Sequence, residues 1–236
     1  MEIKPLFLTT IFQQKRTLDL LLEESKTSSS FYLFLVASAF LTTLGLLLNN
    51  PVIIIGGMLV APLLFPVFLV GMGVSISSRS IIKRAGIVII KSVTIIIGVS
   101  FVTAFLLDTR EITEQIAYAT NANLLYALAA FAAGVVGAFS WAKQNILTNI
   151  PAIAITVALI PPLASTGIAL SLFSREVLAG GITLFLINIV GIVAAAVIVF
   201  SLFGYSRIQK VAEQKVKTEE QKEKNQEAEE QKEKNQ

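Results

Sequence analysis

The sequence predicts an all-α, polytopic membrane protein with six transmembrane helices, arranged as two inverted three-helix repeats with a proline-broken second helix in each. Three observations lead to this fold class. Of the 236 residues, 54% are hydrophobic and only 15% are charged, whereas about a quarter of the residues in soluble domains are charged. The charges gather at the two ends, so that residues 31–206 hold just 7 basic and 4 acidic side chains. A pattern containing prolines occurs once in each half of the chain.

The first segment, residues 1–30, has an amphipathic composition. Its apolar positions are interrupted by Gln13, Gln14, Lys15 and Arg16, so no continuous apolar stretch leads to a small-residue cleavage site. We expect a helix that lies along the cytoplasmic face of the membrane rather than a signal peptide. A frayed leader is the alternative.

Six apolar stretches are each long enough to be transmembrane helices, which need roughly 20 residues to cross the hydrocarbon. They are residues 31–48, 51–76, 85–107, 122–142, 151–173 and 177–203.

The basic residues indicate how these segments are oriented. If all six cross and the N-terminus is cytoplasmic, the outer connections hold only two basic side chains, Arg110 and Arg175. If the second and fifth segments were re-entrant hairpins instead, the basic residues would divide between both sides. We therefore expect six crossings with both termini in the cytoplasm.

The two halves share a proline pattern. Residues 49–63 and 149–163 both contain an Asn-x-Pro start and a later Pro-Leu pair, and six of the seven prolines lie in the second and fifth segments. Three spans per half make the second copy run in the opposite direction, which is a common transporter architecture.

The internal prolines predict a candidate binding or permeation site near the middle of the membrane. A helical proline donates no backbone hydrogen bond, so the carbonyl four residues earlier loses its partner. Lipid cannot replace that partner, whereas protein or a water-filled cavity can. Prolines that kink helices for packing alone are the alternative. The candidate residues are the prolines Pro62, Pro66, Pro161 and Pro162 and the freed carbonyls of Met58, Val157, Ala158 and, because of Pro66, Pro62 itself.

Two polar side chains inside the spans complete the candidate site. Lys91 is ionisable and lies within the third span, where such a residue is a functional candidate, although its long stem could also extend back towards the surface. Asn188 lies in the middle of the last span, where a hydrogen bond between helices is the alternative to ligand contact.

Several classes of function are excluded or disfavoured by composition. The chain has no Cys and no His, which removes thiol nucleophiles, Ser-His-Asp triads and the usual zinc sites. No Asp or Glu lies within a span, and a net charge of +3 gives no basic stripe for nucleic acid. We therefore expect no enzyme, no metal site and no cofactor.

The remaining segments predict partners rather than chemistry. A small-residue face between Ala130 and Ala138 favours close helix packing or a homo-oligomer. The tail repeats Glu-Glu-Gln-Lys-Glu-Lys-Asn-Gln and has the composition of a solvated segment. The predicted organisation is a cytoplasmic N-terminal segment 1–30, a first repeat 31–107, an extracytoplasmic linker 108–121, a second repeat 122–206 and a charged cytoplasmic tail 207–236.

The apolar segments and their proline motifs resemble the uncharacterised hydrophobic-domain family of bacterial and archaeal membrane proteins, which is a domain of unknown function. The resemblance covers roughly residues 31–205, and its anchors lie at 57–63, 123–125, 129–137, 158–164 and 184–190. The family usually shows Arg-Thr-x-Pro before the fourth helix, whereas residues 119–122 read Ala-Thr-Asn-Ala. The resemblance implies a prokaryotic cytoplasmic membrane and no established activity.

The sequence therefore favours a small transporter or channel for an unidentified ion or solute, with a site at the paired broken helices. The alternative is a non-transporting scaffold or sensor, whose N-terminal segment and tail recruit cytoplasmic partners. The first hypothesis predicts a cavity beside the prolines, and the second predicts prolines that are tightly packed.

Overall fold

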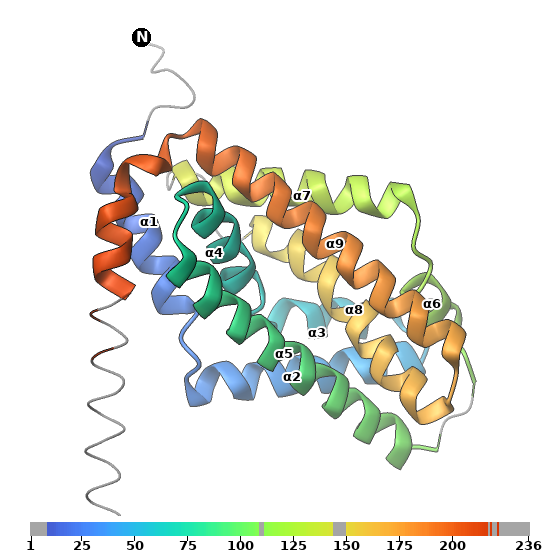
Figure 1. Cartoon of the computed structure of the whole chain (residues 1–236). Helices are drawn as coiled ribbons and strands as arrows, with labels where there is room; N and C mark the ends of the chain where they lie inside the picture. Colours follow the sequence, from blue (N-terminus) through green and yellow to red (C-terminus); the bar gives the residue numbers. More distant parts are fainter. Residues whose placement is uncertain (1–8, 109–110, 144–149, 217, 219–220, 222–236) are drawn as a thin grey trace, which may run out of the picture.

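The computed structural model describes residues 9–108, 111–143, 150–216, 218 and 221, and for 150–157 it describes the backbone only. Within these ranges the chain is helical and contains no strand, which confirms the all-α prediction. The elements are α1 (Ile11–Glu24), α2 (Ser29–Leu47), α3 (Pro51–Val60), α4 (Leu64–Ser75), α5 (Arg79–Leu106), α6 (Glu114–Tyr118), α7 (Leu124–Lys143), α8 (Ile150–Leu172), α9 (Arg175–Leu202) and the 3-10 turn η1 (Tyr205–Ile208) (Figure 1).

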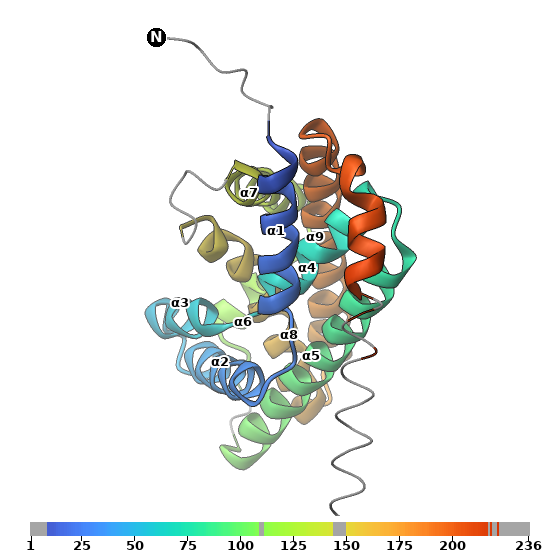
Figure 2. The ribbon, with the colours of Figure 1, turned by 90° about the vertical axis from the view of Figure 1, so that its left-hand side faces the viewer.

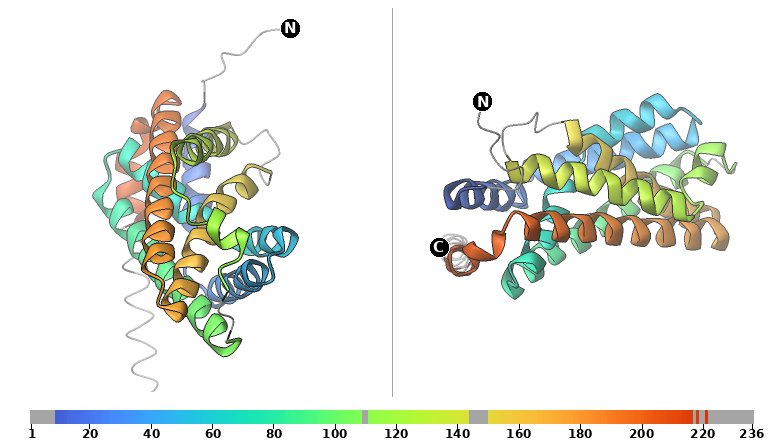
Figure 3. Two further views of the ribbon diagram at one scale, coloured as in Figure 1. Left: turned by 90° about the vertical axis from the view of Figure 1, so that its right-hand side faces the viewer. Right: turned by 90° about the horizontal axis from the view of Figure 1, so that it is seen from above.

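The long helices extend between two ends of the molecule. In Figure 1, α1 lies at one end and α6 lies near the other. Helix α7 packs along α9, α5 packs along α8, and α2 packs along α3. Figure 2 looks onto the end where α1 packs against α4 and α7, and Figure 3 shows the opposite end and a view in which α7 and α9 run side by side.

Apolar helices of spanning length indicate a membrane protein. Among the described residues, α2, α5, α7 and α9 are each long and apolar enough to cross a bilayer, and α3 and α4 pass the same test as a pair bent by 57°. Their outward side chains are also apolar: Leu125 is 74% exposed, Ile90 is 68% exposed and Val190 is 66% exposed. Such continuous apolar surfaces suit lipid better than water.

The turn between α2 and α3 follows from its two asparagines. Asn49 adopts a left-handed backbone with φ of 53°, and the Asn50 amide donates to the Gly45 carbonyl at 2.9 Å, which closes the end of α2. The Asn50 side chain then accepts from Val52 N at 3.0 Å and caps α3, whose first residue is Pro51. Proline suits this position because the first amide of a helix has no intrahelical acceptor.

The predicted break in the second span is present. Helix α3 ends at Val60, Ala61 adopts an extended backbone, and α4 begins after Pro62. The Met58 carbonyl is not left without a partner, because it accepts from the Ala61 amide at 3.3 Å. Pro66 is the third residue of α4, where an amide would have no helical acceptor in any case. This break is therefore an ordinary helix end followed by an ordinary helix start.

The predicted break in the fifth span is wrong. Helix α8 runs unbroken from Ile150 to Leu172 with Pro161 and Pro162 inside it. A helical proline leaves the carbonyl four residues earlier without its usual donor. Here Asn188 on α9 donates to the Ala158 carbonyl at 2.7 Å, which satisfies the acceptor that Pro162 frees and stabilises the continuous helix.

Helix α1 packs on the end of the bundle through its apolar face. Leu18, Leu21 and Leu22 are at most 2% exposed. The buried Gln14 side chain donates at 2.9 Å to the carbonyl of Phe203, the C-cap residue of α9. The N-terminal segment is thus joined to the helical bundle from Thr9 onwards.

The chain after η1 returns to α1. Residues 209–216 are helical, and Ile208, Ala212 and Val216 are buried at four-residue intervals. Lys215 forms an ion pair with Asp19 of α1. The first ten residues of the predicted charged tail therefore pack on the bundle, while residues 217, 219–220 and 222–236 lie outside the described part of the chain.

Candidate functional site

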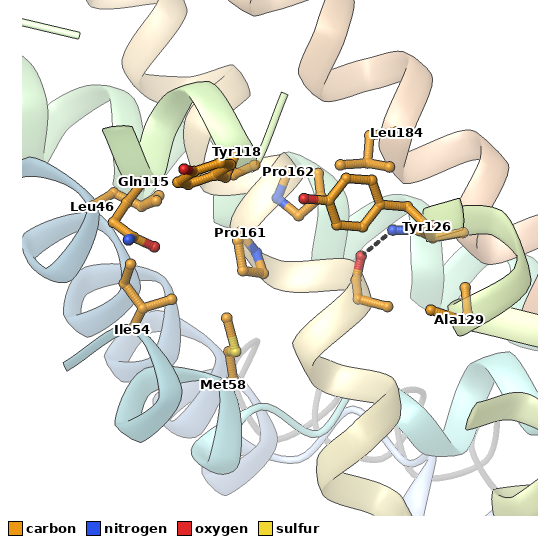
Figure 4. Close-up of a pocket in the computed structure, with 14 residues that line it drawn as sticks. Leu46, Ile54, Met58, Gln115, Tyr118, Tyr126, Ala129, Pro161, Pro162 and Leu184 are labelled. Carbon is orange, nitrogen blue, oxygen red and sulfur yellow. Dashed lines mark hydrogen bonds between the residues drawn. The ribbon is translucent and has the colours of Figure 1, made fainter. Parts of the chain in front are cut away.

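A cavity of about 340 Å³ lies beside the two consecutive prolines of α8. Its walls come from six helices, α2, α3, α6, α7, α8 and α9, which are far apart in the sequence. Figure 4 shows Met58 of α3 on one side of Pro161, with Tyr126 of α7 near Pro162 on the other side. The cavity therefore lies where the two halves of the chain meet.

Asn188 connects α9 to the proline-containing part of α8. Pro162 cannot donate to the Ala158 carbonyl, and the Asn188 Nδ2 donates to it instead at 2.7 Å, the bond that is dashed in Figure 4. The residue is only 3% exposed. Its Oδ1 is buried and has no hydrogen-bond partner among the described residues.

Close helix packing brings Asn188 within reach of that carbonyl. A Cβ added at Gly181 of α9 would lie 2.5 Å from Thr166 Oγ1 and 2.7 Å from the Pro162 carbonyl. Only glycine permits this approach of α9 to α8. The Thr166 hydroxyl itself donates to the Pro162 carbonyl at 2.8 Å, which strengthens the turn that follows the prolines.

The short helix α6 adds polar side chains to the cavity. Thr113, the N-cap of α6, donates through its hydroxyl to the Leu46 carbonyl at 2.7 Å. The backbone N–H of Gln115 donates to Asn49 Oδ1 at 3.1 Å. These bonds hold α6 against the end of α2. Gln115 and Tyr118 consequently line the cavity.

Five of the predicted site residues line this cavity: Met58, Ala158, Pro161, Pro162 and Asn188. Pro62 and Pro66 lie nearby in the chain, in the break and in α4, but not among the lining residues. The side chain of Val157 lies outside the described residues.

Lys91 is separate from the site. It lies on α5 with an exposed side chain and is not one of the lining residues. On a spanning helix its ammonium group therefore faces outward, which suits a side chain that extends along the surface towards water.

Nine of the 14 lining residues were missed by sequence reasoning, and three of them carry polar side chains: Gln115, Tyr118 and Tyr126. Tyrosines near the ends of spans usually belong to the aromatic belt at the membrane interface, so the two tyrosines carry no distinctive signal. Gln115 lies in the linker between the halves, and only the folded position of α6 brings it to the cavity.

The site has no charge and no metal-binding cluster. None of the 14 lining residues is Lys, Arg, Asp or Glu. No group of three or more His, Cys, Asp or Glu side chains occurs in the part of the chain that the structure describes. The arrangement suits binding by shape and a few hydrogen bonds.

The chain is thus helical, its long apolar helices indicate a membrane protein, and an uncharged cavity lies between its halves. The chain belongs to the family described as a domain of unknown function, DUF389, whose sequence profile matches residues 58–194. The matched region includes every lining residue except Leu46 and Ile54. The resemblance seen in the sequence is therefore confirmed.

One relative is an uncharacterized protein, MJ0678, of the archaeon Methanocaldococcus jannaschii. The two chains are 25% identical over 174 residues, which make up 74% of this chain and 54% of the relative. The chain thus matches about half of the length of that relative. No solved structure matches this chain.

Proposed function

We propose that the protein is a small transporter or channel whose solute site is the cavity beside Pro161 and Pro162. The observation that supports this proposal most is the cavity itself. A transporter site is expected where the two halves meet, and the cavity is lined by Met58, from the broken pair α3 and α4, and by Pro161, from the other half. We further propose that the protein is not an enzyme, that it works in a prokaryotic cytoplasmic membrane as a homo-oligomer, and that both termini are cytoplasmic.

The proposed architecture is six crossings in two inverted repeats, and the turns before α5 and α9 support it. Both helices contain 28 residues and begin with arginine after a serine N-cap. In each turn a residue with left-handed backbone precedes that serine, Ser77 with φ of 56° and Phe173 with φ of 53°. The two turns are separated by 96 residues.

The same offset of 96 relates the packing of the two halves. Gly71 of α4 fits against Ala196 of α9, where an added Cβ would lie 2.5 Å from the alanine Cβ. Gly167 of α8 fits against Ser100 of α5, with a corresponding distance of 2.6 Å. At an offset of 96, Gly71 corresponds to Gly167 and Ser100 corresponds to Ala196. The contact between Gly71 and Ala196 is therefore equivalent to the contact between Gly167 and Ser100, as expected if a twofold axis relates the two halves. This supports paired repeats with α5 and α9 in equivalent roles.

The offset also revises which prolines are equivalent. The sequence pattern pairs Pro62 with Pro162 at an offset of 100, whereas the offset of 96 pairs Pro66 with Pro162. Asn188 then corresponds to Ser92, which is fully buried on α5. Each half accordingly has a buried polar residue at the same place in its third helix, and only the asparagine is seen to bond a carbonyl freed by a proline.

The alternative function is a scaffold or sensor that recruits cytoplasmic partners. It predicts prolines packed without a cavity, and the cavity at Pro161 and Pro162 therefore favours transport.

A flux assay tests the proposal. The full chain is reconstituted in proteoliposomes, and the fluxes of inorganic ions and of small neutral solutes are measured. We expect at least one flux to depend on the protein and to fall about tenfold or more in Ala129→Trp, which fills the cavity from α7. Leu128→Trp adds the same ring on the outer face of α7, where Leu128 is 56% exposed, and retains the flux. Absence of flux for every solute, or equal loss in both variants, would contradict the proposal.

A further inference from the structure

The chemistry of the cavity wall restricts what can bind there. The 14 lining residues include no basic and no acidic side chain. Transfer of a charged group from water into such surroundings costs several kcal/mol when no opposite charge compensates for it. The wall therefore disfavours inorganic ions, carboxylates and ammonium groups as bound species.

The larger part of the wall is apolar. Leu46, Ile54 and Met58 line one side, and Leu184 with the ring of Pro162 lies on the other. Ile54, Met58 and Leu184 are at most 5% exposed, so these side chains are fixed by packing in the bundle. A ligand with an apolar body would gain about 25 cal/mol for each Å² that it buries here.

Four polar side chains line the cavity. Gln115 and Tyr118 come from α6, Tyr126 comes from α7, and Asn188 comes from α9. Asn188 is 3% exposed, its Nδ2 bonds the Ala158 carbonyl and its Oδ1 is buried, so this residue supports the wall. The hydrogen-bonding groups open to a bound molecule are therefore those of Gln115, Tyr118 and Tyr126.

The volume limits the size of the ligand. About 340 Å³ is near the lower end of ligand pockets, which run from about 300 to 1,000 Å³. A compact molecule with one ring or a short branched chain fits this space.

We infer that the solute of this site is a small uncharged organic molecule with an apolar body and one amide or hydroxyl group. The inference rests on the proposed function, because it names the class of solute that the cavity would bind during transport. The polar group lies towards Tyr126 and Gln115, and the apolar body lies against Met58 and Leu184.

A series of three probes of similar shape tests the charge requirement. The probes are 4-fluorobenzamide, 4-fluorobenzoate and 4-fluorobenzylammonium, and their binding to the full chain in lipid nanodiscs is followed by the broadening of the fluorine NMR signal. The amide binds wild type and Leu128→Trp, while its binding is lost in Ala129→Trp, which separates the site from partition into lipid. The two ions bind at least tenfold more weakly. Equal binding of the ions, or identical amide signals in both tryptophan variants, would overturn the inference.

A second set of variants keeps the test independent of the cavity-filling change. Tyr126→Phe and Gln115→Leu each remove a hydrogen-bonding group and keep most of the apolar wall. We expect each to weaken amide binding by about 2- to 10-fold, the range for one hydrogen bond, and to leave the binding of 4-fluorotoluene unchanged. Parallel weakening of both probes would indicate a change of shape and would contradict the assigned polar role.

The two proposals fail in different ways. Site-specific binding of the amide without any flux would overturn transport and support the uncharged ligand class. A flux of an inorganic ion that Ala129→Trp abolishes, without binding of the amide, would support transport and overturn the uncharged ligand class.

Discussion

At the scale of single residues, Pro162 and Asn188 act as a pair. Pro162 deprives the Ala158 carbonyl of its helical donor, and Asn188 replaces that donor across the interface between α8 and α9. The cost of a proline inside an apolar helix is thereby offset by a polar residue inside another apolar helix. Each of the two residues would be unfavourable in the membrane without the other.

Replacing Asn188 by Leu tests this pairing. The variant keeps the side-chain size but leaves the Ala158 carbonyl without a donor, so we expect the free energy of unfolding to fall by about 1–2 kcal/mol. The measurement is a denaturant titration in micelles. Thr183→Val, an exposed change on the same helix, should alter stability by less than about 0.5 kcal/mol. Equal effects of the two variants would contradict the role of the hydrogen bond.

Because Tyr205 is buried, we expect the free energy of unfolding to depend on pH in the alkaline range. Tyr205 is fully buried after α9, and burial raises its pKa from 10.0 to about 12, although a hydrogen bond with Thr17 opposes the increase. The unfolded chain therefore releases this proton at lower pH than the folded chain. The stabilisation is fully present below pH 10 and is lost as the pH rises through about 12.

Thermal unfolding between pH 9 and 12 measures this effect. The free energy of unfolding of the wild type should decrease over that range. In Tyr205→Phe this decrease should be smaller, by at most about 1.4 kcal/mol for each pH unit. Tyr118→Phe removes a tyrosine that is 58% exposed and should retain the wild-type slope. A slope that is unchanged in Tyr205→Phe would refute the assignment.

At the scale of elements, adjacent glycines in α3 have opposite roles. A Cβ at Gly57 would lie 2.4 Å from Thr42 Oγ1 and 2.7 Å from Thr42 N, whereas a Cβ at Gly56 would have no atom within 4 Å. Gly57 thus permits α3 to pack closely on α2 and fixes the position of the neighbouring Met58 at the cavity. Gly56 has no such contact to preserve.

This pair gives a matched comparison on one helix. Gly57→Ala should lower the free energy of unfolding by about 1–3 kcal/mol, because the clash involves backbone that cannot move away easily. Gly56→Ala should be neutral or stabilising by about 0.5–1 kcal/mol, because alanine favours the helix. Both are measured by denaturant titration, and a loss of stability in Gly56→Ala equal to that in Gly57→Ala would contradict the packing role.

The contrast between α4 and α8 explains how far the elements could be predicted from sequence. Apolar length alone predicted the ends of the long apolar segments to within two residues, except that α5 begins at Arg79 rather than at residue 85. The effect of the internal prolines could not be predicted locally, because it depends on the tertiary contacts around each proline. In α8 the partner of the Ala158 carbonyl is Asn188, 30 residues away, and the helix continues. Near Pro62 the chain breaks instead.

At the scale of the whole molecule, the cavity combines predictable and unpredictable parts. Prolines and an intramembrane asparagine are exceptional in apolar helices, so Pro161, Pro162 and Asn188 were apparent from sequence. Gln115 reaches the cavity only because α6 folds back onto the end of α2 through the bonds of Thr113 and Asn49, which join residues 66 and 67 positions apart. Sequence periodicity contains no information about contacts of this kind.

Cysteine labelling tests the inverted arrangement of the halves. The chain contains no native cysteine, so single substitutions report unambiguously. Ser80 and Glu176 are the second residues of α5 and α9 and are equivalent at the offset of 96. If the repeats are inverted and the termini are cytoplasmic, a membrane-impermeant maleimide added to intact cells labels Glu176→Cys at least about tenfold faster than Ser80→Cys.

The outcomes of this experiment separate topology from orientation. Both variants should react after the membrane is permeabilised, which verifies that each thiol is accessible. Labelling of Ser80→Cys with protection of Glu176→Cys would reverse the orientation and still require inverted repeats, because equivalent turns would face opposite sides. Labelling of both, or of neither, in intact cells would place the two turns on the same side. In that case α5 and α9 could not be equivalent helices of inverted halves, and the twofold relation between the Gly71 and Gly167 contacts would have no structural basis.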